Sequence, residues 1–117
     1  MAERSIFFRT VARYKKLFAE LGGAMFDAKC LQDALEQLKD QREHLANTTR
    51  VLEAIICHCS NIARAASVSR IREVAIRFRD SAITAYARSV ADPRAIADLL
   101  EETIAGLESE LATPQRA

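Results

Sequence analysis

A heptad pattern of apolar residues runs from Leu31 to Ala66, and it constrains the fold more than any other feature of the sequence. Alternating steps of four and three residues select two interleaved series of positions. The d positions are apolar throughout: Leu31, Leu38, Leu45, Leu52, Cys59 and Ala66. This spacing is typical of a helix that packs along other helices. We therefore predict one long helix over 27–66, with the rest of the chain arranged around it.

The second series, the a positions, is interrupted by Arg42 and Thr49. A polar residue inside such a seam typically fixes the register and the number of associating helices. Asn47-Thr48-Thr49 brings together three poor helix formers, so a break at these residues is the alternative to one continuous helix. Continuity is favoured because no Gly or Pro accompanies them and the heptad register passes through unchanged.

The composition predicts an all-α protein. Residues 24–92 contain neither Gly nor Pro, and half of the chain is hydrophobic although only 6% is aromatic. Ala, Leu and long charged side chains are residues of helices rather than of sheets. A chain of 117 residues can bury one core. We predict an elongated bundle of four, possibly five, helices that forms a single domain over 1–112, with a disordered tail over 113–117.

Capping and turn residues mark the expected boundaries. A first helix is predicted over 5–21 and is ended by Gly22-Gly23, because glycine readily adopts the conformation of a helix C-terminus. Asp27 is expected to cap the long helix. The chain should turn at 67–69, continue as a third helix to about residue 90, and start its last helix at Asp92-Pro93.

Helical periodicity also predicts which faces of the last two helices are buried. The third helix is expected to turn these residues inward: Ile71, Val74, Ala75, Phe78, Ala82, Ala85 and Tyr86. The last helix should bury Ile96, Leu99, Leu100, Ile104, Leu107 and Leu111. Its acidic residues are expected to face outward: Asp98, Glu101, Glu102, Glu108 and Glu110.

The net charge of +1 hides an alternation of sign along the chain. Residues 1–19 carry five Arg or Lys against one Glu, and residues 20–59 carry four basic against seven acidic side chains. Residues 60–90 carry six basic against two acidic, and residues 91–117 carry two against six. Neighbouring segments of a bundle with this pattern attract each other.

No motif indicates a catalytic centre, a cofactor or a metal. Cys57-His58-Cys59 has metal-binding side chains, but residues two apart on a helix point about 200° apart and cannot grip one ion. An exposed mid-helix histidine is typical of phosphotransfer domains, yet His44 is not followed by the Lys or Gly found there. We therefore predict that the protein is not an enzyme.

Nucleic-acid binding is the main alternative to protein binding. Arg9, Arg13 and Lys16 give the first helix a basic side, and Arg70 and Arg77 contribute to another on the third helix. Acidic neighbours and the lack of a recognised reading motif make this alternative less favoured. The absence of a secretory signal, of a long apolar run and of an even number of cysteines predicts a cytoplasmic protein.

The function that remains is an adaptor, chaperone or regulator that binds another protein through a helical surface and forms a homodimer. Arg42 would then pair with Glu43 or Glu53 of a second copy. The residues expected on the interaction surface are Arg42, Leu45, Thr49, Leu52, Arg9, Arg13, Lys16, Arg70 and Arg77.

Overall fold

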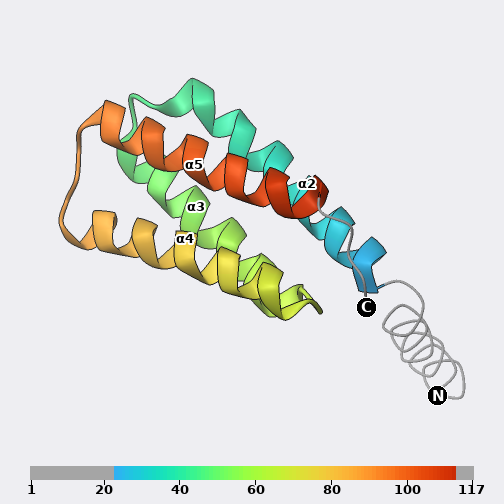
Figure 1. Cartoon of the computed structure of the whole chain (residues 1–117). Coiled ribbons are helices and arrows are strands. Elements are labelled where there is room, and N and C mark those ends of the chain that lie inside the picture. The colour runs from blue at the N-terminus through green and yellow to red at the C-terminus, as the bar shows by residue number, and fades with distance from the viewer. Residues whose placement is uncertain (1–22, 113–117) are drawn as a thin grey trace, which may run out of the picture.

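A computed structural model of the chain describes residues 23–112, which form an all-α helical bundle, as predicted (Figure 1). The predicted helix over 5–21 and the tail over 113–117 lie outside the described residues. The described part contains four α-helices and one short 3-10 helix: α2 (Gly23–Asp40), η1 (Gln41–His44), α3 (Thr48–Ala65), α4 (Ser69–Ala87) and α5 (Pro93–Ala112).

The helices run back and forth along one core (Figure 1). The most extensive contact joins α3 to α4, which form a hairpin. Helices α2 and α5 contact each other and lie against this hairpin, α2 mainly on α3 and α5 on both α3 and α4. Because α2 and α5 cover one side of the hairpin, its opposite side carries no other helix of the described residues.

The prediction of one continuous helix over 27–66 is wrong, since α2 ends at Asp40 and α3 begins at Thr48. Asn47 adopts a non-helical backbone (φ −107, ψ 83), and its Oδ1 accepts a hydrogen bond from the Arg50 N–H at 3.2 Å. The Asn47 N–H donates to the His44 carbonyl at 2.9 Å. One Asn therefore supplies both the turn and the helix cap without Gly or Pro.

The heptad pattern nevertheless identifies the core on both sides of the break. All d residues are buried except Leu45, which is half-buried in the loop after η1. Ile55 and Ile62, beside the seam on α3, are also buried, so α3 faces more than one neighbour. Arg42 and Thr49 are exposed and flank the break. The polar interruptions of the seam thus mark the place where the chain folds back on itself.

Asp27 has a different role from the predicted one. Helix α2 begins four residues before it, at Gly23, so Asp27 does not cap this helix. Its buried carboxylate accepts hydrogen bonds from the Ser67 N–H at 2.9 Å, the Ser67 hydroxyl at 3.1 Å and the Val68 N–H at 2.9 Å. The predicted turn at 67–69 is confirmed, and α2 holds it from the side.

Helix α5 begins at Pro93, as predicted, with the Asp92 carboxylate accepting from the Arg94 N–H at 3.0 Å. The buried residues of its apolar face are Ile96, Leu100, Ile104 and Leu107. Glu110 was expected to face outward but is buried, and it pairs with Arg70 of α4. Glu110 can be buried because the arginine offsets the loss of water around its carboxylate.

We expect Asp27→Ala to lower the free energy of unfolding by about 2–3 kcal/mol, because two backbone N–H groups lose a charged acceptor. Asp27→Asn keeps one carbonyl oxygen and should cost less. Asp33→Ala, at an exposed position of the same helix, is the control and should change little. Urea unfolding measures all three variants, and equal losses for Asp27→Ala and Asp33→Ala would contradict the role given to Asp27.

The two central leucines of the predicted seam should differ in their contribution to stability. Leu52 is 2% exposed, so Leu52→Ala is expected to cost about 2–5 kcal/mol as a core truncation. Leu45 is only half-buried in a loop, and Leu45→Ala should cost clearly less. Thermal and urea unfolding compare the variants directly. A larger loss for Leu45→Ala would show that this loop carries more of the core than its burial indicates.

Candidate interaction surface

Arg42 forms an ion pair within the chain, whereas the sequence predicts Glu43 or Glu53 of a second copy as its partner. Its Nε and Nη2 atoms lie 2.7 and 2.8 Å from Oε1 and Oε2 of Glu101 on α5, in a two-pronged ion pair. The hydrogen bonds lower the pKa of Glu101 and raise that of Arg42. Both side chains are about half exposed. The pair ties the α2 end of the break to α5, so Arg42 does not need a carboxylate from another molecule.

The other residues expected on the seam surface do not form one face. Leu52 is buried by this chain's own helices, and Leu45 is half-buried. Thr49 is exposed in the first turn of α3, where it lines a hollow together with Tyr86 of α4. Leu52 lines the same hollow but is only 2% exposed, so it offers almost no surface to a partner.

The arginines of α4 that were expected to bind a partner are engaged within the chain. Arg70 forms an ion pair with Glu110, with Nε 3.0 Å from Oε2. Arg77 places its guanidinium 5.0 Å from the centre of the Phe78 ring, a cation–π contact. Phe78 lines a hollow with residues of α5. Arg9, Arg13 and Lys16 lie outside the described residues.

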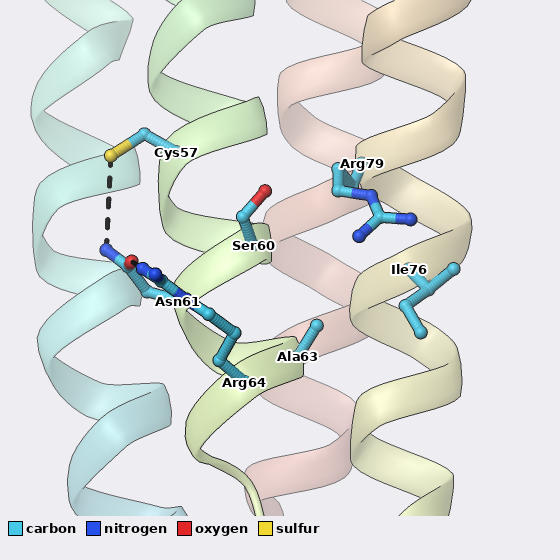
Figure 2. Close-up of a pocket in the computed structure, with 7 residues that line it drawn as sticks. All are labelled: Cys57, Ser60, Asn61, Ala63, Arg64, Ile76 and Arg79. Atoms are coloured by element: carbon cyan, nitrogen blue, oxygen red, sulfur yellow. Dashed lines mark hydrogen bonds between the residues drawn. The ribbon is translucent and has the colours of Figure 1, made fainter.

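A groove lies between α3 and α4 (Figure 2). Helix α3 contributes Cys57, Ser60, Asn61, Ala63 and Arg64, and α4 contributes Ile76 and Arg79. Ser60 and Ala63 are small, so the α3 wall is low where it faces Ile76. An apolar side chain from outside could therefore pack on Ile76 between the two helices.

Exposed large apolar side chains continue from this groove along α4. In the part of the chain that the structure describes, Ile76, Ile83 and Tyr86 are the large hydrophobic residues that remain exposed, by 37%, 44% and 48%. Spacings of seven and three residues place them along one side of the helix. We call Ile76, Ile83 and Tyr86 the α4 stripe. Tyr86 was predicted to face inward, and this prediction is wrong.

Charged side chains flank the α4 stripe. Arg79 forms an ion pair with its sequence neighbour Asp80, whose carboxylate lies 3.1 Å from Nη2 and is 60% exposed. Arg64 donates to the Asn61 side chain on α3, and Arg72 to the Ser69 hydroxyl on α4. Apolar groups with charges beside them are typical of a surface that binds another protein.

The cysteines of α3 do not share a site. Cys57 is exposed at the groove, where the Asn61 amide lies 3.9 Å from its sulfur (Figure 2). Cys59 is buried in the core, and burial raises its pKa to about 12. His58 is half-buried, and burial lowers its pKa. Residues 23–112 contain no group of three or more His, Cys, Asp or Glu side chains arranged to hold a metal ion.

His44 is not placed as a phosphotransfer histidine would be. It ends the 3-10 helix η1 and is half-buried, whereas that reaction needs an exposed histidine in the middle of a helix. The break between α2 and α3, which the heptad pattern concealed, places His44 at the end of a short 3-10 helix and not in the middle of a long α-helix.

Comparisons with protein-family models, with curated proteins and with solved structures gave no match. Among residues 23–112, no helix is both long and apolar enough to cross a membrane.

The three cysteines should differ in their reaction with a thiol reagent such as iodoacetamide at mildly alkaline pH. Cys57 is exposed and should react first, Cys30 is half-buried with a pKa raised mainly by burial, and Cys59 should react last. Peptide mass spectrometry measures the order. In urea the three rates should become similar, and fast labelling of Cys59 in the folded protein would contradict its place in the core.

Proposed function

We propose that this protein is a non-enzymatic interaction module that binds a protein surface through the α3/α4 groove and the α4 stripe, and that it self-associates. An adaptor, a chaperone or a regulator would each use such a module. We further propose that it acts in the cytoplasm, where its three free cysteines would stay reduced.

The observation that carries this proposal is the α4 stripe beside a groove on the uncovered side of the α3/α4 hairpin. Large apolar side chains that are exposed next to one another mark binding sites for other macromolecules. Residues at i, i+7 and i+10 follow one side of a helix over nearly three turns. This shape fits a partner helix that lies along the groove, a common mode of protein recognition.

An enzymatic function is less well supported by the same groove. The chemically reactive group on it is the Cys57 thiol, and the polar atom nearest to its sulfur among the described contacts is the Asn61 amide. An amide cannot accept the proton of a thiol, so this arrangement does not generate the thiolate that a nucleophile requires.

Nucleic-acid binding is the second candidate because α4 carries exposed arginines. The surface of α4 supports nucleic-acid binding less well than it supports protein binding. Arg70 and Arg77 are engaged with Glu110 and the Phe78 ring. Asp80 is paired with Arg79 on the side that carries the α4 stripe. A phosphate backbone would meet these carboxylates and the apolar stripe together, which disfavours binding.

The proposal is tested by tagging the full-length chain and recovering it from source lysate, in one sample treated with nuclease and in one left untreated. We expect at least one protein, either an untagged copy or a different protein, to be retained by wild type and lost with Ile83→Asp, which places a charge on the α4 stripe. Gln32→Asp, at an exposed position of α2, introduces the same residue away from the groove and should retain it.

Two results would contradict the proposal. Retention of the same proteins by wild type and both variants would show that the α4 stripe binds nothing. Loss of all retained protein on nuclease treatment would favour the nucleic-acid alternative. Circular dichroism of each variant confirms that the substitutions leave the bundle folded.

A further inference from the structure

We infer that the occupant of the α3/α4 groove is α4 of a second copy of this chain, bound antiparallel about a two-fold axis that passes between Arg79 and Asp80. This inference rests on the proposed function, in which the same face binds protein. It adds the identity of the partner and the register of the two helices.

A two-fold interface uses the same patch on both molecules, so each copy must present both a projection and a matching recess. The α3/α4 hairpin presents both. Ile83 is 44% exposed and projects from α4. The groove lies beside Ile76 and has a low wall at Ser60 and Ala63. Ile76 precedes Ile83 by seven residues, which is about 10 Å along the helix. Two copies that pack antiparallel can each insert Ile83 into the other's groove.

The spacing along α4 fixes where the axis passes. In an antiparallel pair, two residues oppose each other when they lie equally far from the axis on either side. Ile76 and Ile83 are equidistant from the point between Arg79 and Asp80. An axis at that point places Ile76 of each copy opposite Ile83 of the other. Both of these isoleucine pairs are then shielded from water.

The charges at this point are self-complementary. Arg79 of one copy would face Asp80 of the other, and the same pair is repeated by symmetry. In the single chain these residues form an ion pair between sequence neighbours, with Asp80 60% exposed, so Asp80 can turn to a second molecule at little cost. One step further out, Glu73 would face Tyr86, whose hydroxyl can donate a hydrogen bond to the carboxylate. Opposite charges placed in this way set the register of an interface.

Charge also argues against the chain's own N-terminal segment as the occupant. Residues 1–19 carry five basic side chains and one acidic one. Arg64 and Arg79 line the groove, so this segment would bring like charges together. A second copy instead brings Asp80 to Arg79. The occupant that matches the groove in both apolar contacts and charge is therefore α4 itself.

The test measures the molecular mass of the full-length chain by sedimentation equilibrium from micromolar to submillimolar concentration. The monomer has a mass of 13.0 kDa, and wild type should approach twice this value as the concentration rises. Ile83→Asp should weaken the dimer about tenfold or more, since it places a carboxylate in an apolar recess. Gln32→Asp should dimerise like wild type.

The decisive variants exchange the central charges. Arg79→Asp and Asp80→Arg each place like charges opposite each other, so each should weaken the dimer. The double variant Arg79→Asp/Asp80→Arg restores opposite charges across the axis and should recover most of the affinity. A surface that binds a different protein would not show this recovery. Thermal melting of every variant separates a lost interface from a lost fold.

Several outcomes would overturn the inference. A wild-type chain that stays at 13.0 kDa at all concentrations excludes the dimer. If such a monomer still retains a lysate protein that Ile83→Asp loses, the binding of a different protein stands, and self-association through this groove is excluded. If the monomer melts at a much lower temperature with Ile83→Asp than with Gln32→Asp, the groove is covered by the chain itself. A dimer that the double variant fails to restore excludes this register.

Discussion

The structure depends on one constraint: the apolar stripe that runs through α2 and α3 is buried within a single chain. A break at Asn47 lets the two halves of the stripe lie antiparallel and face the same core. An unbroken helix would have left part of this stripe for another molecule to cover. Because the chain's own helices cover this stripe, the large apolar side chains that stay exposed among the described residues lie on α4.

Two buried carboxylates, those of Asp27 and Glu110, connect the α3/α4 hairpin to the other two helices. Asp27 ties the turn between α3 and α4 to the start of α2. Glu110 pairs with Arg70 at the same end of the bundle and joins the start of α4 to the end of α5. The partners of both carboxylates come from distant segments of the chain, so these contacts fix the hairpin against α2 and α5. The groove between α3 and α4 therefore lies on a rigid support, which lowers the cost of ordering a surface on binding.

Local sequence rules predicted much of the fold. Helix-forming composition, the cap at Asp92-Pro93 and the turn at 67–69 each depend on residues close together in the chain, and the structure confirms them. The break at Asn47 was mispredicted because a single Asn can cap a helix without the Gly or Pro that usually signals a turn. The carboxylate pairings were not predictable in this way. Arg42 and Glu101 are 59 residues apart, and nothing local shows that they meet.

The α4 stripe was missed for a related reason. Periodicity assigns one apolar side to α4, and the buried residues Ile71, Ala75, Phe78 and Ala82 satisfy it. Ile76 and Ile83, which belong to the α4 stripe, lie seven residues apart on another side of the helix. The seven-residue spacing of Ile76 and Ile83 is visible in the sequence. The packing of α3 against α4 was needed to show that these side chains stay exposed.

Disulfide trapping tests the central claim, an antiparallel α4 pair about the point between Arg79 and Asp80, most directly. Full-length chains carry Ile76→Cys or Ile83→Cys, each with Cys57→Ser to remove the exposed thiol. A disulfide requires the two Cα atoms to come within about 7 Å. We predict that an equimolar mixture forms a covalent heterodimer rapidly under mild oxidation, and that either variant alone does so slowly because its cysteines lie about 10 Å apart along the helices. Equal rates in the mixture and in the separate variants would contradict the account.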